Sequence, residues 1–288
     1  MRLLLLLIGG LYLSSATAQD AERVLQTFKD EKIVNHHSIE PLPARKLDVR
    51  IGHRFGDLLG DNGGWPTLYG LENATDVKIG AAYGGTNELS VGFHRTKGSG
   101  TLTALLNGTV KYRLLYQKTD NSSPVSLTFV GISTVSTTSR STSEEAITAF
   151  PKTSHRFVHA AQLLVARKFG DRFSFQLIPS YVHRNLVTNE DENGIFSLGA
   201  AFRFQINKVL GVIGDLTYPF SSLRMPEGSG FYPPIGIGLE IDTGGHVFQV
   251  NFTNATGIIE TDYIPYTRSN WTDLEFRLGF AISRKFNL

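Results

Sequence analysis

Large apolar side chains alternate with polar or small ones through the last eighteen residues of the chain, from Trp271 to Leu288. The even positions from 274 to 282 are all large and apolar, whereas the odd positions from 275 to 283 are charged, polar or small. Because successive side chains of a strand point to opposite faces, the pattern predicts a strand with one apolar face and one polar face. The alternation continues to Phe286, an aromatic residue near the end of the sequence.

The same alternation recurs along the chain from Lys46 onward and predicts about twelve strands, an even number, as single-chain bacterial barrels have. A final amphipathic strand that ends in an aromatic residue resembles the closing strand of bacterial outer-membrane β-barrels. The predicted strands cover residues 46–55, 77–83, 89–93, 110–117, 125–129, 161–168, 173–184, 196–205, 210–218, 235–242, 248–253 and 274–286.

Short and long connections alternate between these segments. The short ones are expected at 84–87, 119–123, 169–172, 206–208 and 242–245, and the longer ones at 56–75, 95–101, 137–155, 188–194, 219–233 and 254–271. A membrane barrel with tight periplasmic turns and longer external loops has this arrangement. A periplasmic β-sandwich or a lipocalin-like barrel would not need it. Residues 46–288 are therefore predicted to form an all-β, antiparallel transmembrane barrel in a Gram-negative outer membrane.

The start of the chain has the features of a secretory signal peptide. A basic Arg2 precedes an apolar run from Leu3 to Leu13, and small residues follow at Ala16 and Ala18. Cleavage before Gln19 is expected, since the run is shorter than the roughly 20 residues of a membrane-spanning helix. Residues 19–45 are polar and irregular, and we interpret them as a periplasmic N-terminal segment that precedes the barrel.

The amino-acid composition limits the kinds of partner that the protein can have. The chain has 28 basic and 26 acidic side chains and no Cys, so no disulfide or lipid-bearing cysteine can form, and nothing suggests nucleic acid as a partner. The partners expected of a membrane barrel are outer-membrane lipid, the barrel-assembly machinery through the C-terminal strand, and a small polar solute.

Charged residues gather on the face opposite the apolar one, where they would line a lumen. An Arg on the lipid face near the midplane would cost about 2–4 kcal/mol, so this sorting is enforced physically. The interior is predicted to be either a water-filled channel or a space closed by salt bridges, and about twelve strands fit both. The predicted lumen-lining residues are Arg50, Arg54, Lys78, Lys111, Arg113, Arg203, Asp215, Glu240, Asp242, Glu275 and Arg277, with Asp48 and Arg184 on the same faces.

A catalytic barrel is the competing interpretation, because some outer-membrane barrels are lipid hydrolases. The sequence contains no G-x-S-x-G, H-x-S-N or H-E-x-x-H motif, and His246 follows a tight turn, where it fits an interfacial role better than catalysis. His36 and His37 are adjacent, so they would point to opposite faces of an extended segment, whereas zinc needs three or four ligands. No catalytic, cofactor-binding or metal-binding residue is predicted.

A third possibility is a binding or structural barrel, in which the loops 56–75, 137–155 and 254–271 hold a partner or the N-terminal segment plugs the lumen. Aromatic residues in these loops, such as Trp65, Tyr263 and Tyr266, either contact a partner or pack over the barrel mouth.

Three stretches together carry a family resemblance: KLDVRIGHRFG at 46–56, AAQLLVARKFGDRFSFQLIPSYVHRNLV at 160–187 and IDTGGHVFQVNFTNATGIIE at 241–260. They resemble a family of bacterial outer-membrane β-barrel proteins of undefined function. The resemblance implies the fold and the location, but no substrate, cofactor or catalytic residue. The function expected from the sequence is a non-enzymatic, porin-like narrow channel for small polar solutes or a docking barrel. A lipid hydrolase and a plugged structural barrel are the alternatives.

Overall fold

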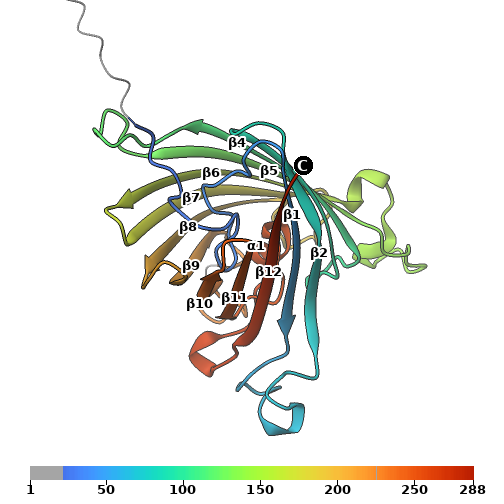
Figure 1. Ribbon diagram of the computed structural model, residues 1–288. Helices are drawn as coiled ribbons and strands as arrows, with labels where there is room; N and C mark the ends of the chain where they lie inside the picture. The colour runs from blue at the N-terminus through green and yellow to red at the C-terminus, as the bar shows by residue number, and fades with distance from the viewer. Residues whose placement is uncertain (1–21, 225) are drawn as a thin grey trace, which may run out of the picture.

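The computed structural model describes residues 22–224 and 226–288. The predicted signal peptide, residues 1–18, lies outside the described residues. Twelve antiparallel strands form one closed barrel, in which each strand pairs with the next and β1 pairs with β12 (Figure 1). The strands are β1 Lys46–Phe55, β2 Ala74–Gly84, β3 Leu89–Thr96, β4 Leu105–Leu115, β5 Ser126–Ser136, β6 Phe157–Phe169, β7 Phe173–Arg184, β8 Gly194–Gln205, β9 Leu210–Phe220, β10 Ile235–Asp242, β11 His246–Thr253 and β12 Arg277–Asn287.

Alternation along each strand separates an outward apolar face from an inward buried face. In β7 the side chains at every second position are buried, while the intervening ones are exposed or, at Tyr181 and His183, half-buried. Every strand exposes at least one large apolar side chain, as a lipid-facing surface requires. One from each strand is Ile51, Ile79, Phe93, Val110, Phe129, Leu163, Leu177, Leu198, Leu216, Ile237, Val250 and Phe286. The predicted antiparallel transmembrane barrel of twelve strands is confirmed.

The closing strand is shorter than its sequence pattern suggested. It begins at Arg277, because the short 3₁₀ helix η4 (Trp271–Asp273) ends in a left-handed residue, Leu274, with φ of 62°. Glu275 therefore lies before β12 rather than on its inner face. From Leu278 onward the predicted alternation holds, and β12 pairs with β1 from Gly279 to Asn287.

The connections fall into two groups at opposite ends of the barrel. One end carries 85–88, 116–125, 170–172, 206–209 and 243–245, and the other carries 56–73, 97–104, 137–156, 185–193, 221–234 and 254–276. The connection 116–125 is longer than the sequence pattern indicated, because the chain around Gln117 and Lys118 pairs with the N-terminal segment at Val24 and Arg23 instead of extending β4. Among the described residues, no helix has the length and hydropathy needed to cross a membrane.

Candidate functional site in the barrel lumen

The N-terminal segment lies inside the barrel. We interpreted residues 19–45 as a periplasmic segment, but residues 27–42 are buried, except for the half-exposed Lys29 and Glu40. The chain turns back on itself, with Ile33 N donating to His36 O at 2.8 Å and an antiparallel bridge between Lys32 and His37. It enters and leaves at the end with the short turns, next to Gln117 and Gly84. We call residues 27–42 the plug hairpin.

A second segment enters the lumen from the opposite end. The connection 254–271 was expected to be an external loop, but residues 254–267 are buried except for the half-exposed Thr256 and Tyr266. They include the helix α1 (Glu260–Tyr266), which lies within the barrel in Figure 1 and packs on β6, β7 and β9. The apolar side chains of residues 254–267, such as Ile259 and Ile264, are buried inside the barrel, which stabilises the inserted position. We call residues 254–267 the α1 loop.

The plug hairpin and the α1 loop meet inside the barrel. Lys32 Nζ donates to Glu260 Oε1 at 2.7 Å, and the Tyr263 hydroxyl lies 3.0 Å from His36 Nδ1. Burial would raise the pKa of Glu260, but the attraction of Lys32 lowers it, so this carboxyl is held ionised. Burial lowers the pKa of His36, whose Nε2 lies 2.6 Å from the Thr217 hydroxyl. The neutral imidazole thus has a hydroxyl partner at each nitrogen.

Charged side chains of the barrel wall hold the main chain of the plug hairpin. Asp215 on β9 accepts hydrogen bonds from the backbone N–H groups of Val34, Asn35 and His36 at 2.6–3.1 Å. Lys111 on β4 donates to three hairpin carbonyls, those of residues 31, 38 and 40, at 2.8–3.1 Å. These contacts satisfy backbone groups that would otherwise be buried without partners.

Arginines of the wall add side-chain contacts to both inserted segments. Arg50 binds the carboxylate of Asp30 through both terminal nitrogens, and Arg54 donates to Asn35 Oδ1 at 2.5 Å and to carbonyls of the α1 loop. Arg113 donates to Ile39 O and to Glu40 Oε2. Such charge-assisted hydrogen bonds are about twice as strong as neutral ones, so the hairpin is fastened at several points.

One side of the lumen is apolar and forms a protein core with the inserted segments. Phe28, Ile33 and Ile39 of the hairpin, with Tyr263 and Ile264 of α1, belong to one buried cluster with the wall. Most of the wall members with large side chains lie on β5 to β9, and one, Leu105, lies on β4. Those on β5 to β9 are Val130, Ile132, Val158, Leu164, Ile178, Val182, Ile195 and Ile213. The described segments therefore close the barrel with an apolar contact on one side and a polar contact on the other.

Glycines in the wall make room for the hairpin. A Cβ at Gly236 on β10 would lie 2.5 Å from Cγ1 of Val34, and a Cβ at Gly199 on β8 would lie 2.6 Å from Nε2 of His36. Both distances are shorter than van der Waals contact, so a side chain at either position would force the hairpin tip to shift.

The structure places most of the predicted lumen residues inside the barrel. Asp242 is half-buried at the short-turn end, and Glu275 lies before β12, where its carboxylate accepts from Asn270 N. Lys78 points inward but has no hydrogen-bond partner among the described residues. The predicted lumen-lining residues that are buried are Arg50, Arg54, Lys78, Lys111, Arg113, Arg203, Asp215, Glu240 and Arg277. Arg203 and Glu240 pair with each other at 2.7 Å, whereas Arg277 donates to Asn254 O.

Four residues of the inserted segments that form the closure were not predicted: Asp30, Lys32, Asn35 and Glu260. His36 was considered only as a metal ligand, and Tyr263 only as a loop aromatic that contacts a partner or packs over the barrel mouth. The sequence did contain a pattern from which a filled lumen could have been predicted. Strands β5, β6, β7 and β9 carry large apolar residues on both faces, which predicts that protein covers their inner face.

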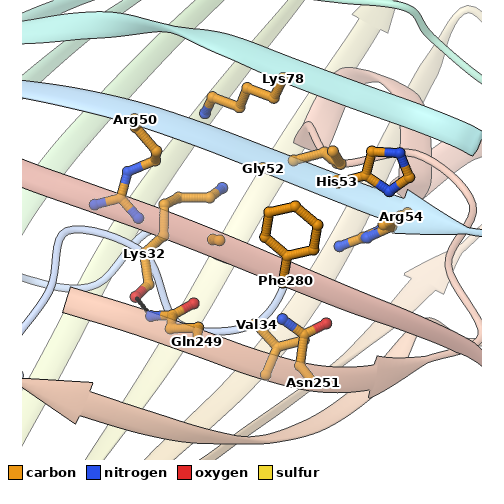
Figure 2. Close-up of a pocket in the computed structure, with 12 residues that line it drawn as sticks. Lys32, Val34, Arg50, Gly52, His53, Arg54, Lys78, Gln249, Asn251 and Phe280 are labelled. Atoms are coloured by element: carbon orange, nitrogen blue, oxygen red, sulfur yellow. Dashed lines mark hydrogen bonds between the residues drawn. The ribbon is translucent and has the colours of Figure 1, made fainter.

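Two of the cavities among the described residues bear on function. A small one of about 30 Å³ lies between the plug hairpin and β1, and Figure 2 shows its lining. A larger cleft of about 520 Å³ opens among the long connections. Residues 99–101, residues 187–191 and the end of α1 at Tyr266 line it, together with Leu223, Ser229 and Phe231. We call it the external cleft. In residues 22–224 and 226–288 no cluster of His, Cys, Asp or Glu could hold a metal ion.

Arginine–carboxylate pairs order the rim of the external cleft. Asp191 accepts from both terminal nitrogens of Arg184 and of Arg224, at 2.7–2.9 Å. Burial would raise the pKa of Asp191, but the two guanidinium groups lower it well below its usual range. Arg224 also donates to Pro265 O in the α1 loop at 2.8 Å, so the rim and the α1 loop are joined.

The family model described as "Membrane bound beta barrel domain (DUF5777)" matches residues 28–286. The chain belongs to this family. The match includes the plug hairpin from Phe28 onward as well as all twelve strands. The protein is therefore a membrane-bound barrel of the bacterial outer membrane, as the resemblance implied. No curated protein matches the sequence.

Solved structures show the same architecture. The KdgM porin is similar with a TM-score of 0.50 and 8% identity, over 84% of this chain and 99% of that one. An outer-membrane channel from Pseudomonas putida F1 has a TM-score of 0.50 and 14% identity, over 86% of this chain and 98% of that one. At these identities the similarity shows the fold alone.

Proposed function

We propose that the protein is a narrow outer-membrane channel for small polar solutes, and that the plug hairpin and the α1 loop keep it closed. The proposal rests on one observation, which is the choice of groups that the charged side chains of the barrel wall bind. Asp215, Lys111 and Arg54 bind main-chain groups of the inserted segments rather than one another. If these segments moved aside, the same charges would face water and line a polar path.

The comparisons support the proposal only at the level of architecture, since two barrels of the same fold are named a porin and a channel. We propose no catalytic role. We further propose that outer-membrane lipid covers the apolar outer face and that the assembly machinery binds β12.

A reversible crosslink tests the channel. The chain has no Cys, so a Val34→Cys, Gly236→Cys pair would be the only thiols present. A Cβ at position 236 would lie 3.0 Å from Cβ of Val34, which is about half an ångström below the lower end of the range found in disulfides. A small shift of the hairpin would provide the difference. The crosslink would hold the hairpin tip against β10.

Single-channel conductance in planar bilayers is the measurement. The wild type is expected to open briefly, the oxidised double variant to stay closed, and reductant to restore the openings. The two single-Cys variants are the controls, because neither can form the intramolecular crosslink. If neither the inserted wild type nor a variant that frees the hairpin conducts, the channel proposal is wrong.

A docking barrel is the second candidate, and the external cleft favours it. Its volume of about 520 Å³ falls within the range of small-molecule sites, and Phe231, Tyr266 and Arg268 offer aromatic and cationic contacts. The crosslinked variant separates the two candidates. A docking barrel would bind its solute equally with the hairpin locked or free, whereas a channel would lose solute passage when the hairpin is locked.

A further inference from the structure

The small lumen cavity between the plug hairpin and β1 is unusual in its charge. Four cationic side chains line it: Lys32 from the hairpin, Arg50 and Arg54 from β1, and Lys78 from β2. Figure 2 shows the amino groups of Lys32 and Lys78 pointing toward one region. Among the described residues that line the cavity, none is acidic.

Three of the four cations are already paired. Lys32 binds Glu260, Arg50 binds Asp30 and Asp48, and Arg54 binds Asn35 and two carbonyls of the α1 loop. Each of these partners lies away from the cavity, because none belongs to its lining. The carboxylates of Glu260, Asp30 and Asp48 nevertheless balance the charges of Lys32 and Arg50.

Lys78 is the exception. It is 3% exposed, and among the described residues it has no hydrogen bond and no salt bridge. Burying an ammonium group without a counter-charge costs several kcal/mol. An ammonium group with free donors thus faces this enclosed space.

We propose that this cavity binds a small monovalent anion such as chloride, held by Lys78 Nζ beside the amino group of Lys32. The cavity of about 30 Å³ has room for roughly two waters, which suits a halide but excludes a larger organic solute. Because Lys32 belongs to the hairpin and Lys78 to the wall, the anion would join the plug to the barrel. This site stands independently of the channel proposal.

Bromide is the probe, because its anomalous scattering separates it from water. Crystals of the full mature protein grown with sodium bromide at physiological ionic strength are expected to show an anomalous peak within hydrogen-bond reach of Lys78 Nζ. A Lys78→Met variant is expected to lose that peak, and Lys208→Met, in the exposed turn before β9, is expected to keep it. A cavity that holds only water, or Lys78 paired with the nearby Glu31, would overturn the proposal.

Thermal unfolding provides the solution test. With ionic strength held constant by a bulky organic anion, the Tm of the wild type is expected to rise with chloride concentration, since a ligand that binds only the folded state stabilises it. Lys78→Met should show no chloride dependence while remaining folded. If no anion binds, the wild type shows no dependence, and removal of the unpaired charge raises its Tm instead.

Discussion

His36 and Tyr263 join two segments that enter the barrel from opposite ends. The Tyr263 hydroxyl lies 3.0 Å from Nδ1 of His36, and the two rings meet edge to face with centroids 5.7 Å apart. His36 lies at the tip of the plug hairpin, and Tyr263 lies on α1. The two parts of the closure are therefore held to each other as well as to the wall, and loss of one is expected to loosen the other.

Tyr263→Phe tests this coupling. The change removes one hydroxyl and leaves a buried nitrogen of His36 without a partner, which costs about 1–3 kcal/mol. Hydrogen exchange followed by mass spectrometry should show faster exchange in both the plug hairpin and the α1 loop. Tyr266→Phe on the same helix is the matched control, because its hydroxyl makes only a 3.5 Å contact with Arg184. Faster exchange confined to the α1 loop would contradict the coupling.

Asp215→Ala is expected to free the hairpin. It leaves the backbone N–H groups of three consecutive hairpin residues without an acceptor, at a cost of at least about 3 kcal/mol in total. The open population would rise roughly a hundredfold. Trypsin should then cut at Lys29 and Lys32 in a barrel that still shifts on an unboiled gel.

The control for this change is Asp171→Ala, in the exposed β6–β7 turn. It should leave the hairpin resistant to trypsin. Equal resistance of Asp215→Ala and the wild type would mean that the apolar contacts hold the hairpin without the help of Asp215.

The barrel was predictable from the sequence because the side chains on each face of a strand match the environment of that face, lipid outside or the barrel interior inside. A lipid face requires apolar residues at every second position, and β1 or β10 shows this with polar or small residues between them. The start of β12 was not predictable in the same way. Leu274 and Phe276 continue the alternation, but the left-handed backbone at Leu274 ends the pattern locally.

The closure was harder to predict because its contacts link distant parts of the chain. Nothing near Lys32 indicates that Glu260 is its partner, and a polar segment such as 19–45 is also typical of a solvated lead-in. The charges of the wall fit an open channel and a plugged one equally, because both need polar inner faces. Only the apolar inner positions, such as Leu164 and Ile178, distinguish a lumen filled by protein from a lumen filled by water.

Gly236→Ala is expected to displace the hairpin tip. The added Cβ would lie 2.5 Å from Val34 Cγ1, and such overpacking costs typically about 1–3 kcal/mol. The Tm should fall, and Val34→Ala in the same chain should restore part of it, since the colliding methyl groups are gone. This non-additivity is the readout of the double-mutant cycle.

Gly108→Ala is the control for Gly236→Ala, because the nearest atom to its added Cβ is 3.9 Å away. It should change the Tm little. If Val34→Ala brings no recovery in the Gly236→Ala background, the glycine acts on the strand itself rather than on the hairpin.

The α1 loop is expected to loosen as the pH rises. Burial raises the pKa of Asp262 to about 7, and the nearby carboxylate of Asp76 adds to the shift, although the N–H groups of Ser99 and Gly100 oppose it. A folded-state pKa above the unfolded value of 3.8 means that the folded protein binds the extra proton. Its contribution to stability is therefore complete below the unfolded pKa and is lost as the pH rises to about 7.

Hydrogen exchange of residues 254–267, corrected for the intrinsic rate, should show more opening at about pH 8 than at about pH 5. Asp262→Asn should remove this pH dependence, because the amide carries no charge at either pH. Asp273→Asn, an exposed residue of the same connection, should leave the dependence unchanged. Asp76 is a second carboxylate close to Asp262, so a pH dependence that survives Asp262→Asn would assign the titration to Asp76 instead.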